Sequence, residues 1–313
     1  MRLLVAIPCL NEEDSIQNVI ERIPRQIDSV DSISVLVIDD GSTDATVEVA
    51  KRSGAAVIQH YTNYGVGYAF NSALNYAIEK GYDIMVNIDG DGQFDPADIP
   101  RLVQPIVDKM ADFVTGSRFF DRGPIENMSK VKLYGNYAMS YLIGRLCQQK
   151  FKDVSCGFRA YSRETLLNLN LHAHFTYTQE TFLDLSSKSI RIVEVPIQVK
   201  YFKDRQSRVA RSIWDYFKKT SSIILTVYRD YYPMRFFGNL SALSGLIALL
   251  FGLLFFWHFY NTGQFSGYLF AGFLSGFFIV LSLVFALSAV AMDMLVRIRK
   301  NQEKMLYLIK KKG

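Results

Sequence analysis

The sequence has one long stretch that lacks charge altogether. Half of its 313 residues are hydrophobic, and no Asp, Glu, Lys or Arg occurs between Arg235 and Asp293. A bilayer core is crossed by roughly 20 helical residues, so this stretch is long enough for two crossings. We predict transmembrane helices at about 238–260 and 268–292, joined by turn-forming residues. The alternative, a buried helical hairpin of a soluble protein, is disfavoured because so long an uncharged stretch rarely stays soluble.

Several short motifs are also missing. No Gly-x-Gly-x-x-Gly follows the first apolar run, which disfavours dinucleotide binding, and no Gly-x-x-x-x-Gly-Lys-Ser/Thr occurs, which disfavours a P-loop nucleotidase. Only three cysteines are present, without a Cys-x-x-Cys pair, and this indicates reduced thiols in a reducing compartment. The N-terminal apolar run is short and meets Pro8, so it predicts a β-strand rather than a signal peptide.

Charge is distributed unevenly along the chain. Residues 1–199 hold 25 acidic and 19 basic residues, whereas residues 200–235 hold nine basic and three acidic ones. Residues 294–313 hold seven basic residues and one acidic residue. The basic segments flank the apolar stretch, which excludes the layout of a nucleic-acid-binding protein, whose basic face lies on the folded domain. Positive flanks are typical of the cytoplasmic side, so we expect the folded domain and both termini in the cytoplasm.

The first 120 residues alternate strand-like and helix-like patterns. Strands are predicted at 3–7, 34–38, 56–59, 83–88 and 113–115, and helical spacing of apolar residues recurs between them. Further helices are predicted at 130–150 and 178–188, and further strands near 157–161 and 191–202. This alternation predicts βαβ units, and therefore an α/β fold with a mostly parallel sheet.

The chain divides into four predicted regions. These are a catalytic domain at 1–209, an interfacial amphipathic region at 210–235, two transmembrane helices within 236–292 and a basic cytoplasmic tail at 293–313. The interfacial region has apolar Ile213, Trp214 and Phe217 beside polar Lys218 and Lys219. A helix with such a pattern next to membrane spans is expected to lie in the membrane interface.

Polar, acidic or glycine-rich turns follow the first four predicted strands. Since the carboxyl ends of parallel strands meet at one edge of a sheet, where ligands bind, these turns are expected to lie together. Asp89 and Asp91 are separated by one glycine. Such a pair suits a divalent cation that also holds phosphate oxygens, as Mg²⁺ typically does. The pair alone is also compatible with an ordinary acidic turn, but all four turns together favour a site.

Five motifs carry a resemblance to a known family. They are Ile7-Pro8 with Asn11-Glu12-Glu13, Ile38-Asp39-Asp40-Gly41-Ser42-Thr43-Asp44, Asn87-Ile88-Asp89-Gly90-Asp91-Gly92-Gln93-Phe94-Asp95-Pro96, Gly116-Ser117-Arg118, and Asp153-Val154-Ser155-Cys156-Gly157-Phe158-Arg159. The sequence resembles family 2 glycosyltransferases of the GT-A fold, over roughly residues 1–210. Within them it is similar to the polyprenyl-phosphate glycosyltransferases, which include dolichol-phosphate mannose synthase and bacterial undecaprenyl-phosphate glucosyltransferases.

The resemblance implies roles for particular residues. The base and ribose of a UDP- or GDP-sugar would be held by Pro8, Asn11, Glu12 and Asp40. Asp89 and Asp91 would bind Mg²⁺ or Mn²⁺ on the donor diphosphate, with Gln93 beside them, and Asp91 would thereby serve catalysis. Asp153 would lie near the reacting centre, and Arg118 would serve catalysis with it. The phosphate of the acceptor lipid would be gripped by Arg118, Arg205 and Arg208.

The implied reaction is transfer of a sugar to undecaprenyl or dolichyl phosphate, with inversion, at a bacterial inner or plasma membrane. A phosphate monoester has a second pKa of about 6, so the acceptor oxygen is already anionic and needs little help from a base. Asp153 would then orient the acceptor or stabilise charge more than remove a proton. Such an enzyme would serve cell-envelope glycan synthesis, and a homo-oligomer is compatible with the sequence.

Three other functions stay open from the residues. A membrane glycosyltransferase with a hydroxyl acceptor would make a glycolipid or a polysaccharide, but a processive synthase should carry Gln-x-x-Arg-Trp before its spans, and Arg211-Ser212-Ile213-Trp214 differs from that. A non-catalytic membrane adaptor is disfavoured because both Asp89 and Asp91 are present. A nucleotidyltransferase is disfavoured by the Asp-Asp-Gly-Ser sequence at 39–42.

Overall fold

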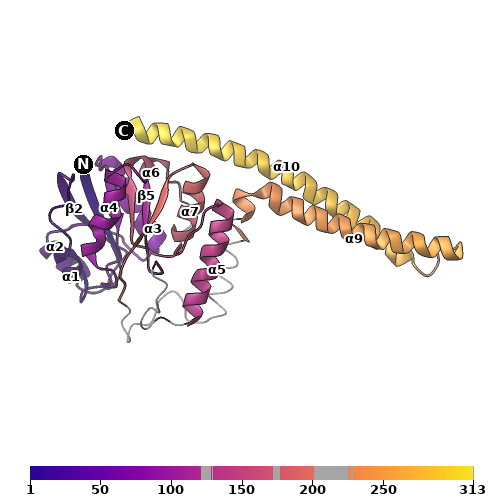
Figure 1. Cartoon of the computed structure of the whole chain (residues 1–313), viewed down its shortest axis with the longest axis horizontal. Helices are drawn as coiled ribbons and strands as arrows, with labels where there is room; N and C mark the ends of the chain where they lie inside the picture. Colours follow the sequence, from indigo (N-terminus) through magenta and orange to yellow (C-terminus); the bar gives the residue numbers. More distant parts are fainter. Residues whose placement is uncertain (121–127, 129, 172–176, 201–224, 227, 313) are drawn as a thin grey trace. The chain divides into compact units, whose positions relative to one another are not determined.

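The structure is a computed structural model, and two compact units make up the chain. It describes residues 1–120, 128, 130–171, 177–200, 225–226 and 228–312. One unit comprises Met1–Arg208 with Leu306–Gly313, and the other comprises Val209–Met305. Figure 1 shows the whole chain. Each unit is described by itself below.

A seven-stranded sheet forms the centre of the described part of the first unit, in the order β3-β2-β1-β4-β6-β5-β7. The strands are β1 (Arg2–Cys9), β2 (Ser32–Asp39), β3 (Ala56–Gln59), β4 (Ile84–Asn87), β5 (Phe113–Ser117), β6 (Arg159–Ser162) and β7 (Ile192–Pro196). Only β6 runs antiparallel to its neighbours, and all other pairs in this sheet are parallel. The predicted α/β class with a mostly parallel sheet is confirmed.

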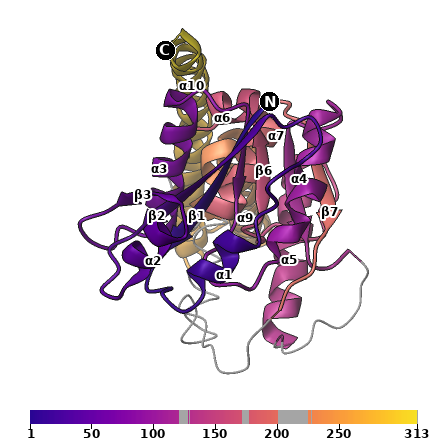
Figure 2. The same ribbon diagram turned by 90° about the vertical axis from the view of Figure 1, so that its left-hand side faces the viewer.

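Helices cover both faces of the sheet (Figure 2). One face packs against α1 (Ile16–Glu21), α2 (Thr46–Arg52) and α4 (Ile99–Val107), which follows the 3-10 helix η1 (Pro96–Asp98). The other face packs against α3 (Val66–Glu79), α6 (Arg163–Asn168) and α7 (Tyr177–Ser187), and α7 in turn packs on α5 (Lys130–Cys147). Alternate residues of a strand point to opposite faces. Accordingly, Leu3, Val5 and Ile7 of β1 join the core with α1, α2 and α4.

Two features of the first unit differ from the sequence prediction. The helix α6 was not predicted, because its six residues are too few to show a helical period. It begins where the side-chain oxygen of Ser162 accepts a hydrogen bond from the backbone N–H of Thr165 at 3.3 Å. The strand near 191–202 ends at Pro196, although Val199 still makes an isolated bridge to Phe94.

The second unit contains α9 (Pro233–Thr262) and most of α10 (Leu269–Lys312). Both helices are long and apolar enough to span a membrane, and only 11% and 6% of their most apolar windows are buried. They contact each other through small residues. The hydroxyl groups of Ser241 and Ser282 each donate to the other's carbonyl oxygen at 2.9 Å, and Ser275 donates to the Ala248 carbonyl at 2.9 Å. Such pairing satisfies polar groups within an apolar stretch.

The predicted spans are confirmed as helices. The first extends beyond both predicted ends, and the second extends beyond its predicted C-terminal end. The helix α9 begins at Pro233. Proline suits the first turn of a helix because a backbone N–H at that position would have no partner within the helix. The helix α10 continues through the basic segment that the sequence analysis separated as a tail. The predicted interfacial helix within 210–235 lies largely outside the described residues, and it stays a prediction together with the boundaries of the four regions.

Candidate active site

The candidate site lies at the edge of the sheet where the parallel strands β1, β2, β4 and β5 end. Because β6 runs the other way, the turn that precedes it, at 152–158, reaches the same edge. The register places Arg159 between Asn87 of β4 and Thr115 of β5. The Asn87 amide nitrogen donates to the Gly157 carbonyl oxygen at 3.0 Å, which holds this turn against the end of β4. The expected meeting of the strand-end turns is confirmed.

The turns after β1 and β2 are joined by hydrogen bonds. Asn11 adopts a positive φ of 52°, which places its side-chain oxygen 2.8 Å from the backbone N–H of Thr43. Its own N–H donates to the Ser42 hydroxyl group at 2.8 Å, and the N–H of Glu12 donates to Thr46 Oγ1 at 2.8 Å. Asn11 is exposed and Glu12 is buried. The two residues predicted to bind the sugar nucleotide therefore differ in solvent accessibility.

Asp40 organises the turn that follows β3. Its carboxylate meets His60 Nδ1 at 2.8 Å and accepts hydrogen bonds from the backbone N–H groups of Tyr64 at 3.1 Å and Gly65 at 2.8 Å. Gly65 has a φ of 96°, a conformation that glycine adopts readily. Asp40 is 5% exposed, whereas Pro8 at the end of β1 is partly exposed. The contribution of both to nucleotide binding stays a prediction.

Asp89 and Asp91 stand on a tight turn directly after β4. A side chain at Gly90 would lie 2.4 Å from Cys9 Sγ, so only glycine allows this turn to pack on β1. A Cβ atom at Gly157 would lie 3.0 Å from the nearer Asp89 oxygen, so the turn before β6 passes close to this carboxylate. Gln93 is partly exposed beside them, and its backbone N–H donates to Asp91 Oδ1 at 3.0 Å.

The electrostatics of this turn favour a cation. Burial, followed by the charge of Asp91, raises the pKa of Asp89 to about 7, although Arg118 and Arg159 act in the opposite direction. Among the described residues, no group of three or more His, Cys, Asp and Glu side chains is placed to hold a metal ion. Two carboxylates, with the remaining ligands supplied by substrate phosphates and water, suit Mg²⁺ or Mn²⁺, so the residues fit the expected metal.

Arg118, at the end of β5, forms an ion pair with Asp153 in the turn before β6. The guanidinium donates from Nε to Oδ2 at 2.7 Å and from Nη2 to Oδ1 at 2.9 Å. Asp153 is fully buried and Arg118 is 12% exposed. Burial alone would raise the pKa of Asp153, but the charge and hydrogen bonds of Arg118 outweigh it and lower that pKa. Asp153 is therefore ionised and a weak base.

Two residues without an assigned role support this pair. Glu194 of β7 accepts the backbone N–H of Asp153 at 2.9 Å and that of Lys152 at 2.9 and 3.0 Å. Arg159 is fully buried, and it donates from Nε to the Cys156 carbonyl at 2.7 Å and from Nη2 to the Val154 carbonyl at 3.1 Å. The only sequence signal for Glu194 was its place as an acidic residue within an apolar strand. Because alternate residues of a strand point to opposite faces, a single acidic residue there is usually interpreted as facing solvent.

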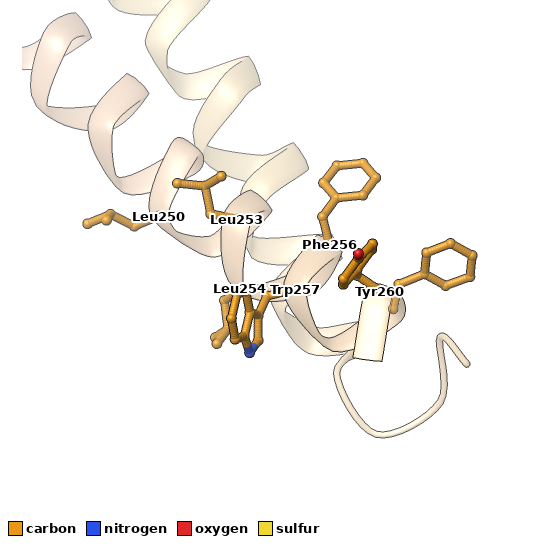
Figure 3. Close-up of a pocket in the computed structure, with 7 residues that line it drawn as sticks. Leu250, Leu253, Leu254, Phe256, Trp257 and Tyr260 are labelled. Carbon is orange, nitrogen blue, oxygen red and sulfur yellow. The ribbon is translucent and has the colours of Figure 1, made fainter. Parts of the chain in front are cut away.

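The structure thus brings most predicted residues to one edge but does not place all of them. Arg205 and Arg208 lie outside the described residues, so their contact with an acceptor phosphate stays a prediction. Arg118 is committed to Asp153, which the sequence analysis did not foresee. A separate groove of about 720 Å³ lies on α9 and is lined by Leu250, Leu253, Leu254, Phe256, Trp257, Phe259 and Tyr260 (Figure 3). It carries no charged group and does not suit a sugar nucleotide.

A strand-end site with an Asp-Gly-Asp turn, on a mostly parallel sheet, defines a nucleotide-sugar transferase of the GT-A fold. The model of "Glycosyl transferase family 2" matches residues 4–169, and the chain belongs to this family. It is a glycosyltransferase, and the resemblance drawn from the motifs is confirmed.

Two of the similar curated proteins are named as glycosyltransferases that act on polyprenyl phosphates. The chain is 31% identical to a UDP-N-acetylglucosamine–dolichyl-phosphate N-acetylglucosaminyltransferase of Methanococcus voltae, over 66% of this chain and 88% of that protein. It is 32% identical to an undecaprenyl-phosphate mannosyltransferase of Micrococcus luteus, over 63% of this chain and 83% of that protein.

Among solved structures, the chain is similar to glucosyl-3-phosphoglycerate synthase from Mycobacterium tuberculosis. In its complex with phosphoglyceric acid that protein is 25% identical, with a TM-score of 0.55, over 72% of this chain and 79% of that chain. A second structure of the same protein holds Mn²⁺, UDP-glucose and glycerol 3-phosphate; it is also 25% identical, with a TM-score of 0.52 over the same shares. The GT-A fold is therefore shared between proteins with different acceptors.

Proposed function

We propose that this glycosyltransferase moves a sugar from a nucleoside-diphosphate sugar to a polyprenyl phosphate at a membrane surface. The observation that carries this proposal is the pair of helices α9 and α10, whose apolar side chains are mostly exposed. They follow the seven-stranded sheet in the chain. A soluble acceptor would not require them. The relatives that act on dolichyl and undecaprenyl phosphate support the same acceptor class.

On the donor side, Pro8, Asn11, Glu12 and Asp40 bind the base and ribose. Asp89 and Asp91, with Gln93 beside them, hold a divalent ion, Mg²⁺ or Mn²⁺, against the diphosphate. When bound, that ion supplies positive charge for the departing nucleoside diphosphate. The similar synthase that was crystallised with Mn²⁺ and UDP-glucose supports this assignment. Burial and the neighbouring charge of Asp91 raise the pKa of Asp89, so a bound cation would stabilise its charged form.

On the acceptor side, Arg118 faces the reacting centre and, with Arg205 and Arg208, binds the lipid phosphate. The ion pair between Arg118 and Asp153 fixes the guanidinium before the acceptor arrives, which reduces the ordering needed in the transition state. Because the pKa of Asp153 is lowered, its carboxylate orients the site rather than accepting the acceptor proton. The acceptor phosphate, already anionic at neutral pH, attacks the anomeric carbon in line with inversion.

The membrane arrangement follows from charge. Basic residues flank the apolar stretch on both sides, and the turn between α9 and α10 carries no charge. We therefore place the catalytic domain and both termini on the cytoplasmic side. A cysteine in place of Ser266 should react with an impermeant reagent added to intact cells, and one in place of Lys311 should not. The reverse pattern would contradict this topology.

A second candidate is transfer to a hydroxyl acceptor. It is favoured by the likeness to glucosyl-3-phosphoglycerate synthase, whose crystal structures hold phosphoglyceric acid or glycerol 3-phosphate. The two candidates differ in the nucleophile, which is a phosphate oxygen of a lipid in one and a sugar or glyceryl hydroxyl in the other.

The proposal is tested with the purified full chain and a panel of labelled UDP- and GDP-sugars. Undecaprenyl phosphate, dolichyl phosphate and 3-phosphoglycerate are offered separately. Lipid products are followed in the organic extract, and the product of 3-phosphoglycerate is followed in the aqueous phase. Arg205→Ala and Arg208→Ala should each lose roughly 10- to 100-fold in transfer, since a charge-assisted contact contributes about 1.5–3 kcal/mol. Donor affinity, measured by calorimetry, should not change. Normal transfer in both variants would remove these arginines from the acceptor site.

A further inference from the structure

We propose that His60 is a positioning residue of the donor site, which leaves Asp40 one acceptor position for the base and so makes the site select uracil over guanine. Asp40 is the base-binding carboxylate of the proposed function, on which this inference rests. The donor would then be a uridine nucleotide. Three protein groups already occupy the Asp40 carboxylate, and their geometry decides what a base can still contact.

The sheet places His60 beside Asp40. The strands β2 and β3 are parallel neighbours, and Asp39 at the end of β2 pairs in register with Gln59 at the end of β3. Asp40 and His60 are the next residues after these two strands. The backbone N–H of His60 also donates to the Asp39 carbonyl oxygen at 2.8 Å. The meeting of the ring and the carboxylate is therefore set by the strand register.

Both nitrogen atoms of the His60 ring have partners. Nδ1 lies 2.8 Å from Asp40 Oδ1, and Nε2 lies 2.9 Å from the Ser72 hydroxyl group of α3. An ionised carboxylate only accepts hydrogen bonds, so Nδ1 carries a hydrogen atom and donates it to Asp40. In the neutral ring, Nε2 then accepts from Ser72. Two partners at opposite sides of the ring fix its orientation and its tautomer.

Two tyrosine rings cover the histidine. The rings of Tyr64 and Tyr68 lie 5.8 and 5.0 Å from that of His60, and both meet it edge-on. His60 is 8% exposed, whereas Tyr64 and Tyr68 are 47% and 41% exposed. A hydrogen bond that is shielded from water is electrostatically stronger than an exposed one. The contact from His60 to Asp40 is therefore in place before a nucleotide binds.

The Asp40 carboxylate has most of its acceptor positions filled. Oδ1 accepts from His60 and from the backbone N–H of Tyr64 at 3.1 Å, and Oδ2 accepts from the backbone N–H of Gly65 at 2.8 Å. An ionised carboxylate has about four lone-pair positions, two on each oxygen. These three contacts from described residues leave one position, and it is on Oδ2.

One acceptor position suits uracil better than guanine. Uracil presents a single ring N–H between two carbonyl groups, and this N–H needs one acceptor. Guanine presents its ring N–H beside an exocyclic amino group, and a carboxylate binds this pair with both oxygens. Because His60 and Tyr64 fill Oδ1, the guanine amino group would lack its acceptor. An unpaired polar group is what makes a binding site discriminate strongly between ligands.

The test uses the full-length protein in detergent with Mn²⁺ and measures binding of UDP, GDP and 3-methyl-UDP by calorimetry. The methyl group of 3-methyl-UDP replaces the ring hydrogen. We expect UDP to bind at least about tenfold more tightly than GDP and roughly 10- to 100-fold more tightly than 3-methyl-UDP, the effect of one hydrogen bond to a charged group. GDP that binds as tightly as UDP would overturn the selection of uracil.

Two substitutions separate the two contacts of the His60 ring. In His60→Asn the amide nitrogen lies near the place of Nδ1 and can still donate to Asp40, whereas in His60→Gln it lies near the place of Nε2 and reaches Ser72. We expect His60→Asn to keep the preference for UDP over GDP, and His60→Gln to reduce it by about tenfold. The same preference in both variants, whether kept or lost, would overturn the role of His60, because a general loss of stability affects both alike.

The matched control is His258→Gln, since the ring of His258 contacts the Ser266 carbonyl oxygen at 3.0 Å, between α9 and α10. Its nucleotide affinities should equal those of the parent. No acceptor takes part in these measurements, so a preference for UDP in a protein that transfers no sugar to lipid would contradict only the acceptor assigned above. A parent protein that binds none of the three nucleotides would contradict the donor site and the role of His60 together.

Discussion

Arg118 and Asp153 form a bidentate ion pair, with nitrogen–oxygen distances of 2.7 and 2.9 Å, between the end of β5 and the turn before β6. The pair joins two segments that sit on adjacent antiparallel strands. Because Asp153 is fully buried, its charge depends on Arg118 for compensation. The relationship means that a residue predicted to bind the acceptor also holds the site together.

The first prediction concerns this pair. Arg118→Ala should destabilise the protein by about 3–5 kcal/mol, since it leaves a buried carboxylate uncompensated. The double variant with Asp153→Asn should recover much of that loss, because the remaining side chain is neutral. Thermal unfolding of the detergent-solubilised variants measures both effects. Arg22→Ala is the control, since its pair with Asp95 is exposed and should contribute less than about 1 kcal/mol. Equal losses for Arg118→Ala and Arg22→Ala would contradict the account.

The second prediction concerns the metal. Asp91→Asn keeps the side-chain oxygen that accepts the Gln93 N–H at 3.0 Å, so the turn should retain its shape. Transfer should nevertheless fall by at least about 100-fold, because metal stabilisation of the leaving group contributes several kcal/mol. EDTA should silence the parent protein, and added Mn²⁺ or Mg²⁺ should restore it. Asp31→Asn, at an exposed surface pair, is the matched control and should remain active. Full turnover in EDTA would exclude a metal at Asp89 and Asp91.

The third prediction concerns pH. The pKa of Asp89 is raised from 3.8 to about 7 in the metal-free fold, so the folded state binds this proton more tightly than the unfolded state. Stability of the metal-free protein attributable to Asp89 should therefore fall as pH rises from about 4 to 7. The difference in melting temperature between parent and Asp89→Asn in EDTA should change in that direction. Mn²⁺ affinity should rise over the same interval as the proton leaves. A difference that does not vary with pH would refute the shift.

The fourth prediction concerns Glu194. Glu194→Ala removes the acceptor of two backbone N–H groups, those of Lys152 and Asp153, which typically costs about 1–3 kcal/mol. The turn that carries Asp153 should loosen, so kcat should fall while donor affinity stays unchanged. Glu194→Gln keeps an acceptor oxygen and should recover most of kcat. If Gln and Ala behave alike, charge rather than the hydrogen bonds is what matters at this position.

Much of the fold was visible in the sequence because the strands of a parallel sheet are short, apolar and regularly separated by helices. All seven strands were anticipated, including β3, whose predicted and observed bounds agree. The direction of β6 was not, since residue pattern does not distinguish parallel from antiparallel pairing. The C-terminal end of α10 was not predicted either. Charged residues show where an apolar stretch ends, but a helix can continue through them.

The candidate site was predicted as a set of residue types, and its internal pairing was not. Asp89 and Asp91 were recognisable from their spacing and their place after a strand. The bond between Asp40 and His60 joins positions twenty residues apart, and the one between Arg118 and Asp153 joins positions 35 apart. Such contacts depend on the tertiary arrangement of the turns, which the local sequence pattern does not predict.

The measurement that tests the central claim most directly compares two acceptors that differ in one group. The full-length protein in vesicles is given its labelled nucleotide sugar, Mn²⁺ or Mg²⁺, and either undecaprenyl phosphate or the corresponding free prenol. The account predicts a labelled glycolipid with the phosphate only, and none in the Asp91→Asn variant. Efficient transfer to the free prenol, or no transfer to the lipid phosphate, would contradict it.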